Sequence, residues 1–138
     1  MDKILTIDGK EVGFRATALT PRLYRHKIGR DIIRDLNRLR KAYVRVMQVQ
    51  QSAPSEDATP EELSAYTEAL QDAQLDVLDL EIFEDAAYVM AKQYDASIPG
   101  SPEEWLEEFS TFSVYKVLPE ILELWQLNQQ TTSTSKKK

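Results

Sequence analysis

Hydrophobic positions near the start of the chain fall in two short runs separated by a turn. Residues 4–16 read ILTIDGKEVGFRA, and the runs flank Asp8-Gly9. An Asp-Gly pair favours a two-residue hairpin turn because both turn positions need a positive φ. The pattern predicts a two-stranded β-hairpin over about residues 3–17, with Gly13 marking a bulge. Such a hairpin is marginal alone, so we expect it to dock on helices or to pair with another chain.

Three Ser/Thr-Pro pairs predict where helices begin. Each pair offers a capping hydroxyl followed by proline at the first helical position, where proline is tolerated. Two of the pairs also have glutamate three residues after the hydroxyl, the spacing of a capping box. The pairs are Thr20-Pro21, Thr59-Pro60 and Ser101-Pro102. We therefore expect helices to start near residues 21, 60 and 102.

Apolar residues then follow helical spacing through most of the chain. The first helical region is expected to break near Gly29, and residues 51–58 form a polar loop between two long helices. Residues 60–94 keep a helical pattern, residues 102–109 form a short helix, and residues 113–127 form the last helix, which Pro119 either begins or kinks. Residues 129–138 lack apolar side chains and are expected to be disordered. The sequence thus predicts one mainly α domain over residues 1–128 with an N-terminal β-hairpin.

Charge is strongly segregated along the chain. Residues 1–20 are neutral, residues 21–50 carry nine bases and two acids (+7), residues 51–125 carry two bases and eighteen acids (−16), and the tail adds +3, which gives the net −6. One stripe of bases follows helical spacing: Arg30, Arg34, Arg38, Lys41 and Arg45. A duplex-binding face needs net positive charge, which the acidic remainder opposes, and no aromatic residues interleave the stripe to stack on bases. We therefore expect protein contacts rather than nucleic acid.

Composition removes several classes of site. The chain has no cysteine and one histidine, which excludes disulfides, thiolate metal sites and histidine clusters. No apolar run is long enough to cross a bilayer, and residues 1–11 do not have the pattern of a signal peptide. We expect no cofactor and no membrane contact.

Four glutamates raise an enzymatic alternative. Glu81 and Glu84 lie one helical turn apart, and Glu104 and Glu107 repeat that spacing. The arrangement resembles the ExxE…ExxD magnesium signature of all-α nucleotide pyrophosphohydrolases, with Glu107 in place of Asp. In so acidic a region such pairs also arise by chance, and acids in a first helical turn favour the helix dipole. We therefore favour a protein that is not an enzyme.

Aromatic residues gather near the C-terminal end. Trp105, Phe109, Phe112, Tyr115 and Trp125 fall within twenty-one residues. Such a cluster usually forms core, although in a small helical protein part of it can be an exposed partner patch.

Four phrases together carry a family resemblance. They are IDGKEVGFRAT, LTPRLYRHKIGRDIIRDLNRL, FEDAAYVMAKQYD and SPEEWLEEFSTFSVYKVLPEILELWQLN, and they span about residues 5–128. The chain resembles the tail assembly chaperones of long non-contractile-tailed phages, or related prophages, of Gram-positive bacteria. A structural head or tail completion protein is a further alternative.

The resemblance implies a mostly helical protein that binds the tape measure protein and keeps it soluble until tail-tube protein polymerises. It also implies location in the bacterial host cytoplasm, absence from the mature virion, and often a longer product made by ribosomal frameshift. Lys136–Lys138 are compatible with a slippery run of A, and self-association of the chain stays open. The residues expected to contact a partner are Tyr24, Arg30, Arg34, Arg38, Trp105, Phe109 and Trp125.

Overall fold

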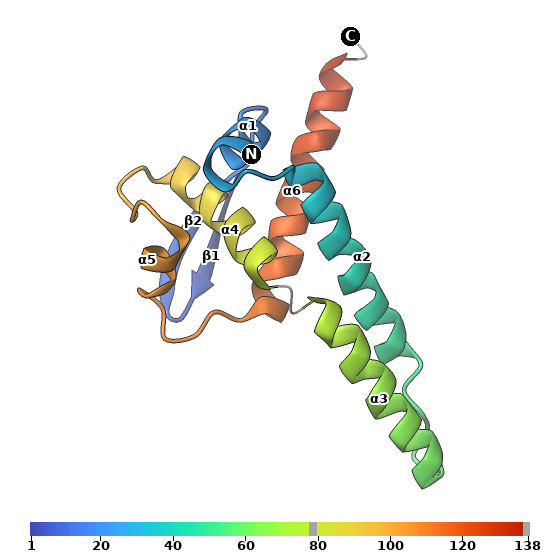
Figure 1. Cartoon of the computed structure of the whole chain (residues 1–138). Helices are drawn as coiled ribbons and strands as arrows, with labels where there is room; N and C mark the ends of the chain where they lie inside the picture. The colour runs from blue at the N-terminus through green and yellow to red at the C-terminus, as the bar shows by residue number, and fades with distance from the viewer. Residues whose placement is uncertain (78–79, 137–138) are drawn as a thin grey trace.

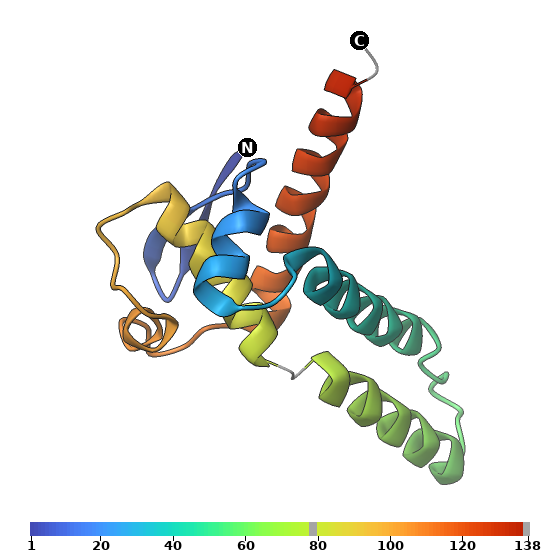
Figure 2. The ribbon, with the colours of Figure 1, turned by 45° about the horizontal axis from the view of Figure 1, so that its top comes forward.

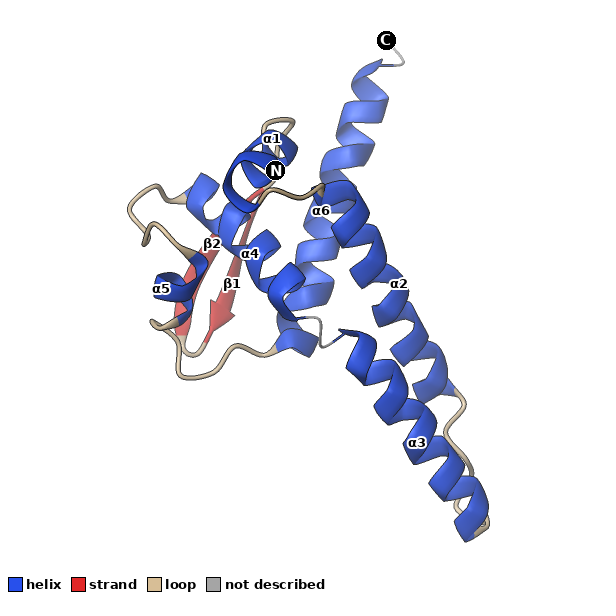
Figure 3. Ribbon diagram, in the orientation of Figure 1, coloured by secondary structure: helices blue, strands red, loops and turns tan. Residues whose placement is uncertain are grey.

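The fold consists of a small helical body from which two helical segments project (Figures 1 and 2). The computed structural model describes residues 1–77 and 80–136. In this part of the chain the elements are β1 (Asp2–Ile7), β2 (Lys10–Arg15), α1 (Thr20–Ile28), α2 (Ile32–Gln51), α3 (Pro60–Val77), α4 (Leu80–Tyr94), α5 (Pro102–Leu106) and α6 (Val114–Lys136). The predicted fold class, mainly α with an N-terminal β-hairpin, is confirmed (Figure 3).

The hairpin forms at the predicted turn. β1 and β2 pair antiparallel, with Ile7 opposite Lys10, and Asp8 and Gly9 have φ of 53° and 75°. These positive values are those that the favoured two-residue turn requires.

Gly13 does not mark a bulge, which corrects the prediction. It pairs with Ile4 in an unbroken register. A Cβ at this position would lie 2.1 Å from Cε1 of Tyr94, the last residue of α4. Glycine is therefore needed here because a tyrosine ring of the central helix rests directly on the strand.

The helix starts were predicted correctly, but one cap works differently. Thr59 accepts a hydrogen bond from the Glu62 N–H (3.1 Å), and Ser101 accepts one from the Glu104 N–H (3.2 Å). Thr20 instead lies inside α1, after Leu19 at the N-cap. Its buried hydroxyl donates to Gln93 Oε1 (2.7 Å), so it ties α1 to α4 rather than capping α1.

Helix α4 is the centre of the body. Nearly every side chain from Ile82 to Ala91 is buried, which is the pattern of a helix covered on all sides. The hairpin, α1, α2, α5 and α6 all pack against it. Lys3 of β1 forms ion pairs with Glu120 and Glu123 of α6.

Helices α2 and α3 form an antiparallel arm that leaves the body (Figures 1 and 2). The polar loop joins them as predicted, since α2 ends at Gln51 and α3 begins at Pro60. The helical pattern over residues 60–94 is divided between α3 in the arm and α4 in the body, and residues 78–79 lie outside the described part.

Helix α6 projects from the body in another direction (Figure 1). Pro119 lies inside the helix, so it does not begin it. The α6 backbone continues to Lys136, into the segment for which the sequence predicts disorder, and Lys137 and Lys138 lie outside the described residues. The domain boundary at residue 128 stays a prediction.

Candidate partner-binding surfaces

A buried polar cluster joins α1, α2 and α4. The Tyr24 hydroxyl donates to Asp35 Oδ2 at 2.6 Å, and Arg30 Nε donates to the same oxygen at 2.8 Å. Arg30 Nη2 also donates to Asp85 Oδ2 at 2.8 Å. The cluster thus places one guanidinium between two carboxylates that are only 11% exposed.

The electrostatics fix the protonation of this cluster. Burial, followed by the hydrogen bond to Asp35, raises the pKa of Tyr24, so the phenol keeps its proton. The hydrogen bond to Asp35 is also the main cause that raises the pKa of Arg30. Burial raises the pKa of Asp85, and the Arg30 charge opposes that shift. Arg30 is therefore the cation that makes the two buried acids tolerable.

The cluster shows how two of the predicted contact residues, Tyr24 and Arg30, are used within the chain. Tyr24 is fully buried and offers no surface to a partner. Arg30 directs its guanidinium inward to Asp35 and Asp85, an acid that lies fifty-five positions away in the sequence. Both residues hold the body together where the arm begins.

The rest of the basic stripe lies on the exposed side of the arm. Arg34, Arg38, Lys41 and Arg45 are exposed on α2. Within its bounds, α2 carries five bases and one acid, whereas α3 carries five acids and no base. The arm is therefore one positive helix beside one negative helix.

The aromatic cluster is largely core. Trp105 is 1% exposed and meets the rings of Phe14, Tyr88, Phe109 and Phe112 at centroid distances of 5.3–6.4 Å. Trp105 is therefore part of the core, and its contact with a partner stays a prediction. Phe109 is half-buried, stacks on Phe112 at 5.7 Å and has Lys10 Nζ 5.4 Å from its ring. The side chain of Tyr115 lies outside the described part.

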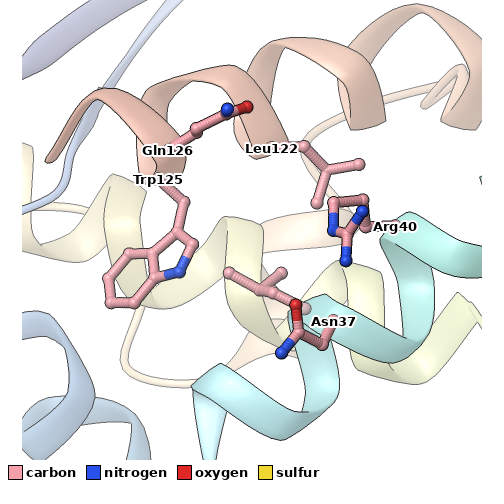
Figure 4. Close-up of a pocket in the computed structure, with 6 residues that line it drawn as sticks. Asn37, Arg40, Leu122, Trp125 and Gln126 are labelled. Atoms are coloured by element: carbon pink, nitrogen blue, oxygen red, sulfur yellow. The ribbon is translucent and has the colours of Figure 1, made fainter. Parts of the chain in front are cut away.

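Trp125 lies apart from the other aromatic residues, at a cleft between α2 and α6. It is 8% exposed. The cleft measures about 310 Å³ and is lined by Leu36, Asn37, Arg40, Leu122, Trp125 and Gln126 (Figure 4). Of the two tryptophans that were predicted to contact a partner, only Trp125 borders this opening.

One apolar surface was missed by the sequence reasoning. Ile33, Val44 and Met47 of α2 are 46%, 40% and 41% exposed. They share a helix face, because positions 33, 44 and 47 are separated by eleven and three residues. The spacing is visible in the sequence, but the longer stripe of buried apolar residues on the same helix is the more obvious pattern.

The four glutamates do not form a metal site. Within the described residues, no group of three or more His, Asp or Glu side chains could hold a metal ion, so Glu81, Glu84, Glu104 and Glu107 are not gathered. Burial, with the nearby charges of Asp85 and Glu81, raises the pKa of Glu84. The four carboxylates of the magnesium signature are therefore not assembled at one place in the described part of the chain.

Over the described residues, none of the helices combines the length and apolar character needed to span a bilayer. No family model, curated protein or solved structure matches the chain.

Proposed function

We propose that the protein is a tail assembly chaperone of a long non-contractile-tailed phage or prophage of Gram-positive bacteria. It binds the tape measure protein in the host cytoplasm and keeps it soluble. It releases this client as tail-tube protein polymerises, and so is absent from the mature virion. The proposal rests on the sequence resemblance, and the arm supports it.

The arm is the observation that best fits such a role. It extends from the body (Figure 1). Along α2 it combines exposed apolar side chains with exposed charged ones. A long helical client needs many weak contacts that can be released together, because tight contacts would resist tail assembly. An exposed helical hairpin on an independently packed body can offer such contacts.

Coexpression with the tape measure protein tests the proposal directly. We expect the client to move from the insoluble to the soluble fraction when the chain is present. Reversing two arm charges, Arg34→Glu with Lys41→Glu, should reduce that effect. The matched control is Arg22→Glu with Arg25→Glu on α1, which changes the net charge equally. A client that stays insoluble with the unchanged chain would refute the chaperone role.

Mass spectrometry of purified virions separates a chaperone from a head or tail completion protein. We expect no peptides of this chain in finished particles. Stoichiometric recovery of the chain in virions would instead support a structural component.

The frameshifted longer form needs its own test. The gene with its downstream sequence should give two bands on a blot against the N-terminal hairpin. The longer band should vanish when the codons for Lys136–Lys138 are recoded silently. A single band would remove the frameshift from the proposal and leave the chaperone role to the solubility assay.

A further inference from the structure

An exposed apolar line runs along one face of α2. Positions 33, 37, 40, 44 and 47 are spaced by four, three, four and three residues, so they share a helix face. Ile33, Val44 and Met47 supply apolar surface there, and Asn37 and Arg40 lie between them. The buried stripe that contains Leu36, Leu39 and Val46 occupies a different face. The line is therefore additional to the core.

The cleft between α2 and α6 continues this line. Asn37 and Arg40 line one wall, and Leu122, Trp125 and Gln126 of α6 line the other (Figure 4). Leu122 is half-buried and Trp125 is buried, and their side chains supply the apolar part of the α6 wall. We call the cleft together with Ile33, Val44 and Met47 the α2 groove.

The groove suits an amphipathic helix. A helix that docks in a groove uses apolar residues at i, i+3/i+4 and i+7, the same repeat that the α2 line presents. Asn37 and Gln126 have amides that can both donate and accept hydrogen bonds at the rim. Arg40 offers a planar fork that pairs with a carboxylate through two hydrogen bonds.

Charge selects which amphipathic helix fits. Arg40 is the charged residue that lines the cleft, and Arg34 and Lys41 are exposed on the same helix. These three bases attract carboxylates and repel a basic helix, whereas most of the acids of the arm belong to the other helix, α3.

We infer that the α2 groove is a docking site for an amphipathic helix of another protein, one whose apolar stripe is flanked by aspartate or glutamate. The inference rests on the proposed function only in that such a helix would belong to the client. The groove's chemistry is argued from α2 and α6 alone.

A fluorescent label tests the site, because the chain has no cysteine of its own. Val44→Cys carries an environment-sensitive dye in the groove, and Ile4→Cys carries it on the exposed face of the β-hairpin as the control. The probes are two synthetic peptides of about eighteen residues, or five helical turns. Both have the same leucine stripe, flanked by glutamate in one and by lysine in the other.

We expect the glutamate peptide to give a saturable blue shift at position 44 and none at position 4. The lysine peptide should bind much more weakly. Arg40→Glu should weaken binding of the glutamate peptide about tenfold, as the loss of an interfacial charge pair would. The charge-matched control Arg22→Glu should leave binding unchanged, since α1 contributes no residue to the cleft. Circular dichroism confirms that each variant is folded.

Three results of the peptide titrations would overturn the inference. They are no saturable shift at position 44, an equal shift at position 4, and unchanged affinity in a folded Arg40→Glu variant. A shift that depends on protein concentration without peptide would place a second copy in the groove, which also contradicts the chosen occupant.

The solubility assay separates this inference from the proposed function. If Arg40→Glu abolishes peptide binding but still keeps the tape measure protein soluble, the chaperone role stands and the groove is not its client site. If the peptide binds but the client stays insoluble, the docking site stands and the chaperone role fails.

Discussion

Replacing Arg30 tests whether the cluster beneath the arm is internal. Arg30→Met keeps a long apolar stem but removes the charge that Asp35 and Asp85 share. Arg34→Met is the matched control, because Arg34 is a nearby arginine that is exposed on α2. If Arg30 served only a partner, both variants would be equally stable.

The burial of the ion pair sets the size of the stability loss that we expect for Arg30→Met. Removing one partner from a buried ion pair costs about 3–5 kcal/mol. Arg30 is 37% exposed, so water can partly replace it, and we expect a loss of about 2–3 kcal/mol in the free energy of unfolding. For a chain of this length that corresponds to a fall in Tm of roughly 8–12 °C. Arg34→Met should stay within about 0.5 kcal/mol.

The loss of stability in Arg30→Met should depend on pH. The raised pKa of Asp85 means that its buried carboxylate favours the protonated form, so its effect on stability is most favourable at low pH and is lost as pH rises through that pKa. Removing Arg30 raises this pKa further, because Arg30 was the group that lowered it. The gap between Arg30→Met and the unchanged chain should therefore shrink as pH falls.

Urea denaturation followed by circular dichroism measures these differences. Adding Asp85→Asn to Arg30→Met should recover part of the loss, because it removes a buried charge that has lost its partner. Equal stability of Arg30→Met and Arg34→Met would refute the internal role of Arg30. A gap that widens on acidification would refute the account of Asp85.

Two further perturbations probe how the β-hairpin is held. Gly13→Ala should lower the free energy of unfolding by about 1–3 kcal/mol, because its Cβ collides with the Tyr94 ring. In a double-mutant cycle, the loss should be smaller when Tyr94 is also replaced by alanine. Asp8→Asn should lower Tm near neutral pH, because the Asp8 carboxylate accepts the Ser110 N–H at 2.8 Å and that bond lowers its pKa below the ordinary 3.8. This contribution should disappear as pH falls through the lowered pKa, so thermal melts of the two proteins should converge in acid.

Features set by neighbouring residues could be predicted from the sequence. The Asp8-Gly9 turn and the starts of α3 and α5 depend on contacts within three or four residues. The break at Gly29 is equally local, because Gly29 ends α1 with a φ of 86°. Such chemistry is visible in the order of residues alone.

Features that depend on residues far apart in the sequence could not be predicted from it. Thr20 reads as a cap, but its hydroxyl is used by Gln93, seventy-three positions away. Gly13 reads as a bulge until Tyr94 is placed over it. Arg30 belongs to a basic stripe by spacing, yet Asp85 turns it inward. In each case a tertiary contact overrides the local pattern.

The candidate site likewise has one part that follows from local sequence and one part that depends on tertiary contacts. The exposed bases of α2 were expected from their spacing, and their exposure follows from the position of the stripe opposite the core. The groove could not be foreseen, because it needs Leu122 and Trp125 of α6 beside Asn37 and Arg40 of α2. Nothing in the sequence indicates which pair of helices will cross.

The two tryptophans give the protein two separate optical reporters. Trp105 is enclosed by four aromatic rings in the body, so its emission follows whether that body is folded. Trp125 borders the α2–α6 cleft, so its emission follows what enters there. A Trp125→Phe variant leaves Trp105 as the sole indole. Subtracting the spectrum of this variant from that of the unchanged chain isolates the Trp125 emission, so docking and unfolding can be followed separately without any label.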